Sequence, residues 1–262
     1  MTPMYTVEHV ADEPVSPRVL IHHLDGAMDA GHAGALAVEQ LLMTLPHERL
    51  ATFDADSLVD YRARRPPMTF STHSYTDVEM PEIALDLLQD DDGEDLLLLH
   101  GAEPDYRWHE FTGAVTHLAL TMGVTQAIGL AGMPMAVPHT RPILVTAHGP
   151  RADLLPRIDG NKPTFEVSAS ASHLLELRLQ EGGIDHVGLS VHVPQYLAES
   201  YLPQAAVAAL EYLSAVTGRT LPTDELREAS RDVIRQIDAQ ANSSPEVQGV
   251  IQNMERRYDD VV

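Results

Sequence analysis

The sequence predicts a three-layer α/β protein, in which helices flank a largely parallel or mixed sheet and a helical pair follows at the C-terminal end. Two observations predict this fold. Short apolar runs alternate with segments of helical periodicity, and parallel neighbours in a sheet need such helical crossovers. One run, residues 95–100 (DLLLLH), is apolar at nearly every position, which is typical of a strand covered on both faces.

The first half of the chain supplies strands and helices in turn. Residues 18–24 form a short apolar run with β-branched members and predict a strand, whereas residues 29–45 carry small and apolar residues at helical spacing and predict a helix. Residues 60–67 are too basic and too rich in proline to continue a strand, so we expect a loop there. Further strands are expected at residues 50–53 and 68–72, and a helix is expected at residues 82–88, closed by an acidic turn at residues 90–95.

The second half continues the alternation and ends in helices. We expect strands at residues 125–131, 143–147 and 187–193, and helices at residues 108–122, 172–180 and 204–217. Gly218 closes the last of these, and apolar stripes beyond it predict two amphipathic helices. Ser244 and Pro245 predict the start of the second, because serine caps helices and proline suits the first helical position. We therefore expect a main domain over residues 1–218 and a C-terminal helical extension over residues 219–262. Three arrangements of the two helices stay open: they cover the main domain, pair with each other, or cap a partner subunit.

The charge of the chain excludes several classes of partner. It has 39 acidic and 17 basic residues, which gives a formal net charge of −22. Such a surface repels phosphate groups, so we expect neither nucleic acid nor membrane as a partner. No run of about 18 apolar residues and no signal-peptide pattern occurs, so we expect a cytoplasmic protein. With no cysteine, disulfides, thiolate nucleophiles and cysteine metal sites are excluded.

The loop at residues 25–34 (DGAMDAGHAG) is the first candidate site, because ligands of open α/β sheets bind where strands end. Its glycines are spaced as in a phosphate-binding loop, but histidine and alanine stand where that loop has lysine and serine or threonine. Asp25 and Asp29 would also repel a polyphosphate, which excludes nucleoside triphosphates. Two interpretations stay open. Gly26 permits a tight turn and Asp29 caps a helix, or the loop places a carboxylate in a cleft.

Two further loops carry candidate binding residues. The loop after the apolar strand contains Glu103 and the single tryptophan, Trp108, which suits ligand or protein recognition. Alternatively, Glu103 pairs with Arg107 at a helix entry and the indole is packed. Prolines on both sides hold a later loop extended, and it presents His139 and Arg141 either as an anion-binding pair or as partners of a structural carboxylate.

Motifs that would identify an enzyme do not occur in the sequence. There is no G-x-S-x-G elbow, and the default role of Ser170 or Ser172 is to cap the helix that follows. Fourteen histidines are present, but none stands in H-E-x-x-H or comparable spacing, and His22 and His23 lie on one strand and face opposite ways. We therefore predict no catalytic residue, no metal site and no cofactor.

Six segments of the chain carry a family resemblance. They are LDGAMDAG from Leu24, DYRARRPPM from Asp60, DLLLLHGAEPDYRWHEF from Asp95, GLAGMPMAVPHTRP from Gly129, HLLELRLQEGG from His173 and VGLSVHVPQYLA from Val187. Together they resemble the family of the second proteasome assembly chaperone, in its actinobacterial branch. They run in order through most of residues 17–215.

The resemblance implies an α/β fold similar to that of purine nucleoside phosphorylases and an oligomer of identical subunits, with a trimer favoured. It also implies proteasome subunits as partners, because archaeal and eukaryotic relatives assemble or engage the 20S proteasome. It implies no catalytic residues. Those relatives often dock through a C-terminal hydrophobic-Tyr-X tail, whereas Tyr258 lies too far from the end of this chain. The two C-terminal helices offer another interaction surface.

Two functional hypotheses follow from the sequence. The leading one is a non-enzymatic, homo-oligomeric assembly or interaction protein. The alternative is a small-molecule binder or nucleosidase-like hydrolase with a cleft formed by carboxylates, a histidine and an arginine. That cleft would be built from Asp25, Asp29, Glu103, His139 and Arg141, provided that these side chains converge.

Overall fold

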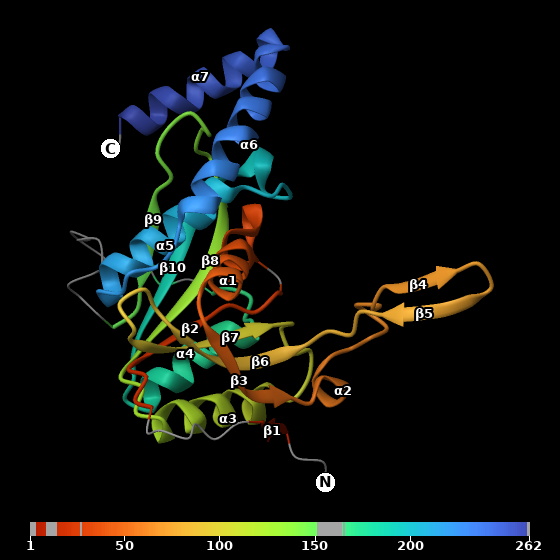
Figure 1. Cartoon of the computed structure of the whole chain (residues 1–262). Coiled ribbons are helices and arrows are strands. Elements are labelled where there is room, and N and C mark those ends of the chain that lie inside the picture. Colours follow the sequence, from red (N-terminus) through yellow and green to blue (C-terminus); the bar gives the residue numbers. More distant parts are fainter. Residues whose placement is uncertain (1–3, 9–14, 27, 151–163, 165, 261–262) are drawn as a thin grey trace.

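The computed structural model describes residues 4–8, 15–26, 28–150, 164 and 166–260. Within this described part, the main sheet has eight strands in the order β1-β3-β6-β7-β2-β8-β10-β9 (Figure 1). The strands are β1 (Tyr5–Val7), β2 (Val19–His22), β3 (His47–Phe53), β6 (Ile83–Gln89), β7 (Asp95–Gly101), β8 (Gln126–Met135), β9 (Val145–His148) and β10 (Asp185–Pro194). The helices are α1 (Ala33–Thr44), α2 (Ala55–Leu58), α3 (Trp108–Thr121), α4 (Ala171–Glu181), α5 (Pro203–Thr217), α6 (Asp224–Asn242) and α7 (Pro245–Asp259), with 3-10 turns η1 (Ala30–His32) and η2 (Gln195–Leu197).

The sheet is parallel in its centre and antiparallel towards both edges. The strands β7, β2, β8 and β10 pair in parallel. The strands β6, β3 and β1 continue the sheet antiparallel on one side, and β9 does so on the other. The mixed α/β sheet predicted from the sequence is confirmed. Because the carboxyl ends of β7, β2, β8 and β10 meet at one edge, the loops that leave these strands lie near one another.

Helices cover both faces of the sheet and make three layers. One core cluster packs α1 and α5 against Ile21, Leu98 and Val191. The other packs α3 and α4 against Leu20 and Leu99 on the opposite face. Neighbouring residues of one strand thus enter different cores, as the alternation of side chains along a strand requires.

The prediction of a helix at residues 82–88 is wrong, because this segment is the strand β6. It pairs antiparallel with both β3 and β7, and all but its last residue are buried. A short apolar run that is buried on both faces lacks the polar stripe by which a surface helix is distinguished, so periodicity alone could not decide. The strand β1 was not predicted from the sequence.

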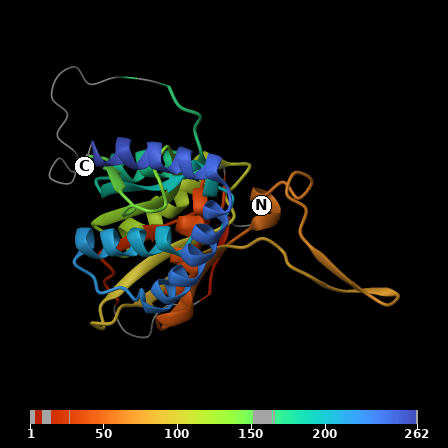
Figure 2. The same cartoon turned by 90° about the horizontal axis from the view of Figure 1, so that it is seen from above.

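A two-stranded arm extends from the body between β3 and β6. It consists of β4 (Met68–Ser71) and β5 (Ser74–Val78), which pair antiparallel as a separate sheet. The arm points away from the body in both views (Figures 1 and 2). The strand expected at residues 68–72 is confirmed, but its partner β5 was not predicted.

The C-terminal helices extend beyond the sheet. The helix α6 packs on the α1 and α5 core through Leu226, Val233 and Ile237, the apolar stripe expected from the sequence. Ser244 accepts a hydrogen bond from the amide of Val247 and caps α7. In the part of the chain that the structure describes, no helix is both long and apolar enough to cross a membrane.

Candidate functional site

The ends of β2 and β7 bring three of the predicted site residues together. The amide of Asp25 donates to the carbonyl of Gly101 at 2.8 Å, and the amide of Glu103 donates to the carbonyl of Asp25 at 3.0 Å. The side chain of Glu103 lies over Gly26, where a Cβ atom would stand 1.8 Å from Glu103 Oε2. Glycine at position 26 therefore makes room for this carboxylate.

Asp29 connects the first helix to the centre of the sheet. Its Oδ1 accepts hydrogen bonds from the amides of Gly34 at 2.9 Å and Gly132 at 2.8 Å, and its Oδ2 accepts one from Ala35 at 3.0 Å. Asp29 thus caps the start of α1, which is one of the two roles expected from the sequence, and also holds β8.

His23 lies buried beneath this loop and faces two carboxylates. Its Nδ1 donates to the carbonyl of Leu130 at 3.0 Å. Its Nε2 lies 3.3 Å from Asp25 Oδ1 and 3.5 Å from Asp29 Oδ2, in directions too bent for good hydrogen bonds, so the attraction is mainly electrostatic. Burial opposes the charged form, but the two carboxylates outweigh it and raise the pKa of His23.

Trp108 begins α3, and its indole Nε1 donates to the carbonyl of Pro104 at 2.6 Å. The neighbouring Arg107 donates to Glu110 at 3.0 and 2.7 Å. Glu103 Oε1 instead accepts a hydrogen bond from the amide of Ala171 at 2.6 Å, at the start of α4. Ser170, one of the two expected caps, accepts from the amide of His173. The Glu103 loop is therefore held against α4.

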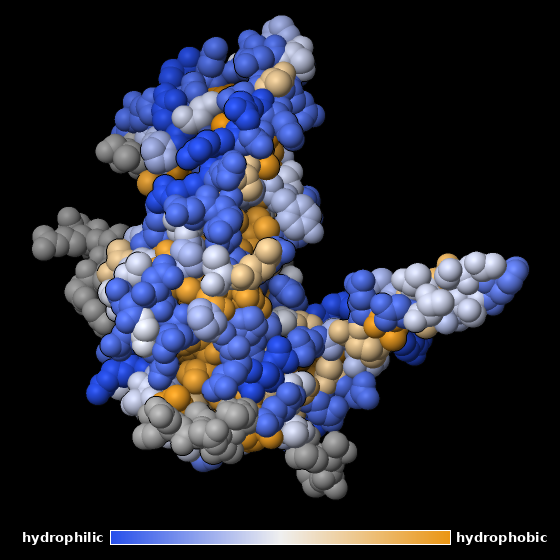
Figure 3. Space-filling view, in the orientation of Figure 1, coloured by the Kyte–Doolittle hydropathy of each residue, from blue (hydrophilic) through white to orange (hydrophobic). Residues whose placement is uncertain are grey.

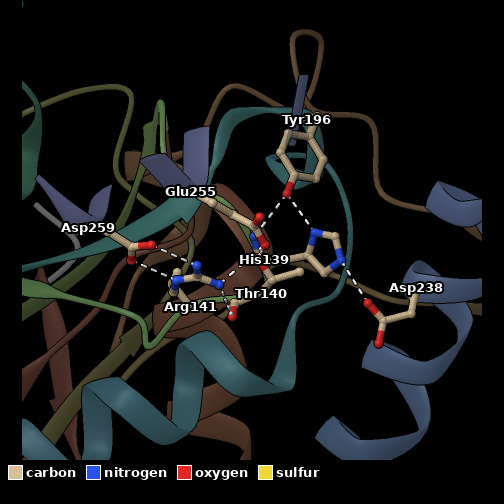
Figure 4. A network of polar contacts seen from close by, with 7 residues as sticks. All are labelled: His139, Thr140, Arg141, Tyr196, Asp238, Glu255 and Asp259. Carbon is tan, nitrogen blue, oxygen red and sulfur yellow. Dashed lines mark hydrogen bonds and ion pairs between the residues drawn. The ribbon is translucent and has the colours of Figure 1, made fainter. Parts of the chain in front are cut away.

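His139 and Arg141 belong to a second place, beside the C-terminal helices (Figure 4). The buried ring of His139 contacts the Tyr196 hydroxyl through Nδ1 at 2.6 Å and Asp238 Oδ1 through Nε2 at 3.1 Å. Arg141 donates to both carboxylate oxygens of Asp259, at 2.8 Å each, and to Glu255 at 3.2 Å. These contacts hold α6 and α7 to the loop after β8.

The predicted site residues therefore form separate groups. Asp25, Gly26, Asp29 and Glu103 lie at the carboxyl ends of β2 and β7, whereas His139 and Arg141 lie under α6 and α7. Glu103 is one of the residues that line a cavity of about 160 Å³, whereas His139 is one of those that line a separate cavity of about 230 Å³.

Polar groups that were not predicted from the sequence also line the first cavity. A row of four residues crosses three strand pairs in register: His22, Gly129, Gly188 and His148. Glu176 of α4 accepts a hydrogen bond from His148 at 3.0 Å. The one signal in the sequence was the pair of glycines inside two predicted strands, because such glycines mark a close approach.

A buried histidine pair adjoins this row. His22 Nε2 and His186 Nε2 lie 3.0 Å apart, and His186 Nδ1 lies 3.7 Å from Glu176 Oε2. Burial lowers the pKa of His22 to about 3 and that of His186 to about 4, so both rings are neutral at pH 7. Among the described residues, no three histidines or carboxylates are grouped so as to hold a metal ion.

A family model described as the PAC2 family matches residues 23–241. The chain belongs to the PAC2 family. This PAC2 chain is 43% identical to the Mycobacterium tuberculosis protein Rv2714, described as of unknown function, with a TM-score of 0.93 over 99% of this chain and 90% of that one. It is 36% identical to a Corynebacterium glutamicum protein of unknown function, with a TM-score of 0.90 over 98% and 97% of the two chains.

A more distant solved structure is described as a proteasome-assembly chaperone homologue, Rv2125 of Mycobacterium tuberculosis. It is 21% identical to this PAC2 chain, with a TM-score of 0.79 over 89% of this chain and 99% of that one. At that identity, the likeness shows the fold alone. Among curated proteins, none matches the chain.

Proposed function

We propose that this PAC2-family chain is a non-enzymatic, homo-oligomeric protein, with a trimer favoured, that acts as an assembly chaperone linked to the proteasome. Membership of the PAC2 family and the fold shared with a proteasome-assembly chaperone homologue support the chaperone role. The oligomer is supported by one structural observation, the exposed arm formed by β4 and β5.

Every residue of the two arm strands is exposed, including large apolar ones. Phe70 and Tyr75 pack edge to face with ring centroids 5.1 Å apart, yet they remain 59% and 68% exposed. Apolar residues also extend over the base of the arm (Figure 3). A two-stranded hairpin without a covering surface is only marginally stable in water. The arm therefore needs a partner that covers its apolar side chains.

A second copy of this chain is the partner that the charge pattern favours. Two copies that each carry a net charge of −22 repel one another over most of their surfaces. Residues 68–78 (MTFSTHSYTDV) contain a single acidic residue, Asp77. The arm is thus a surface on which like copies meet with little repulsion and bury apolar area.

The oligomer is tested by measuring molar mass with light scattering. The wild-type chain is expected at a multiple of its 28.7 kDa monomer mass. The double substitution Phe70→Ser and Tyr75→Ser is expected to shift it towards the monomer, because about 25 cal/mol is lost for each Å² of apolar contact removed. Met43→Ser is the matched control, since Met43 is exposed on α1 outside the arm. A monomeric wild type, or a double variant of unchanged mass, contradicts the proposal.

The link to the proteasome is tested separately by native affinity capture with the full chain as bait. Proteasome subunits are expected among the captured proteins. The Arg141→Gln variant is expected to capture less, because it removes the contacts with Asp259 and Glu255 that hold α7, one of the two helices that offer an interaction surface. Tyr258 donates its hydroxyl hydrogen to the carbonyl of Pro142 at 2.9 Å, so it holds α7 to the body. Capture without any proteasome subunit would refute this link and leave the oligomer proposal standing.

A further inference from the structure

The cavity on the α4 side of the sheet is lined by polar groups in an unusual arrangement for a protein interior. It has a volume of about 160 Å³ and lies over β2, β8, β9 and β10, beside the first turns of α4. Its lining includes His22, His148, Glu103 and Glu176. It is distinct from the cavity lined by His139 beneath α6 and α7.

Two glycines form the floor of this cavity and make room for its polar groups. A Cβ atom at Gly129 would lie 2.8 Å from His22 Cε1 and 3.3 Å from Glu176 Oε1. A Cβ atom at Gly188 would lie 2.1 Å from His148 Cε1. Any larger residue at position 129 or 188 would displace an imidazole ring. The imidazole rings of His22 and His148 therefore lie directly over these two glycines.

Glu176 supplies negative charge to the cavity. Burial alone would raise the pKa of Glu176, but the hydrogen bond from His148 contributes most to lowering it overall. Glu176 is thus a carboxylate at neutral pH, flanked by the neutral rings of His22 and His186. Burying an ionised group is costly unless it finds partners of opposite charge or hydrogen-bond donors.

The tautomers of the two buried histidines follow from this charge. The carboxylate of Glu176 attracts a hydrogen on His186 Nδ1, 3.7 Å away, so that His186 Nε2 carries a lone pair. That lone pair accepts the hydrogen bond from His22 Nε2 at 3.0 Å. His22 Nδ1 is then an acceptor, and it is buried without a hydrogen-bond partner in the described structure, in a residue that is only 1% exposed. An unpaired buried acceptor is costly, and a ligand that donates a hydrogen bond would remove that cost.

The cavity thus offers acceptors and negative charge, with apolar side chains of Leu24 and Met133 also in its lining. We propose that it binds a small planar organic cation that carries several N–H donors, of the guanidinium or amidinium class. Such a cation matches two carboxylates and a ring nitrogen with a fixed fork of donors, and its flat face can pack on the imidazole rings that cover the two glycines. This proposal does not depend on the proposed chaperone role.

The test is calorimetric titration of the full-length protein with methylguanidine, with N-methylurea as the neutral probe of similar shape. Saturable binding of methylguanidine is expected in about the millimolar range or tighter, and no binding of N-methylurea. Glu176→Gln is expected to weaken binding by about tenfold to a hundredfold, because a hydrogen bond to a charged group is lost. Glu181→Gln, on the exposed side of the same helix, is the matched control and is expected to bind as the wild type does.

A second measurement uses only the wild-type protein, in case Glu176→Gln does not fold. In histidine-labelled NMR spectra, methylguanidine is expected to shift the ring signals of His22, His148 and His186 and to leave the exposed His117 unchanged. The proposal is overturned if methylguanidine does not bind, if Glu176→Gln folds and binds it as the wild type does, or if Zn²⁺ alone shifts these rings while methylguanidine does not.

Discussion

Arg141 joins the loop after β8 to the last residue of α7, because its Nε and Nη2 atoms each donate to a different oxygen of Asp259 at 2.8 Å. Such a two-point contact fixes orientation as well as distance. Figure 4 shows that Glu255 and Thr140 lie in the same network. Together with the Tyr258 hydroxyl, which donates to the carbonyl of Pro142, these contacts hold α7 to a loop more than a hundred residues earlier in the chain.

Arg141→Gln is expected to release α7 while leaving the main core intact. Hydrogen exchange followed by mass spectrometry should show faster amide exchange across residues 245–259, with little change in β2, β7 and β8. Arg235→Gln serves as the control, because Arg235 is an exposed arginine of α6 that pairs with Asp232 in its own helix. Equal exchange in α7 for both variants would show that Arg141 does not hold this helix.

Asp29→Ala is expected to destabilise the protein by about 2 to 4 kcal/mol. The substitution leaves the amides of Gly34, Ala35 and Gly132 without their acceptor, and losing a helix cap together with a buried hydrogen bond has a cost of that order. Urea unfolding measures the change. Asp185→Ala, at an exposed position that begins β10, should change the free energy of unfolding by less than about 0.5 kcal/mol.

His23 is expected to make stability depend on pH on the alkaline side. Its pKa in the folded state is raised by Asp25 and Asp29. A raised folded pKa contributes stability that is complete below the unfolded value of about 6.5 and is lost as the pH rises through the folded pKa. The free energy of unfolding of the wild type should thus fall, relative to that of His23→Gln, as the pH rises from 6 upwards. Parallel pH curves for the two proteins would rule out this role.

Gly101→Ala is expected to destabilise the protein by about 3 kcal/mol. Gly101 has a φ of +106°, and a Cβ atom there would lie 2.0 Å from the carbonyl oxygen of Glu82 in the backbone. Gly93 also has a positive φ, +80°, but a Cβ atom there meets nothing within 4 Å. Gly93→Ala should therefore cost only about 1 kcal/mol, from backbone strain alone. Equal losses in urea unfolding would mean that strain, and not the clash, sets the cost at Gly101.

Local patterns in the sequence were sufficient for most elements of the fold. The apolar run at β7, the crossover helices, the cap at Ser170 and the Ser244-Pro245 start of α7 each depend on neighbouring residues, which a sequence shows directly. The strand β6 was misread because its burial comes from β3 and β7, which pair with it from distant parts of the chain. The partner strand β5 was missed because its residues alternate in no apolar pattern and remain exposed.

The fold class, the family resemblance, the acidic character and the loops in which polar residues gather all follow from the order of the amino acids. Which side chains meet depends on how the chain folds: Asp29 meets Gly132, His139 meets Asp238, and His22 meets His186. Secondary structure follows from short-range periodicity, whereas strand register and helix packing bring together side chains that are about a hundred or more residues apart. A row such as His22, Gly129, Gly188 and His148 exists only once three strand pairings are fixed.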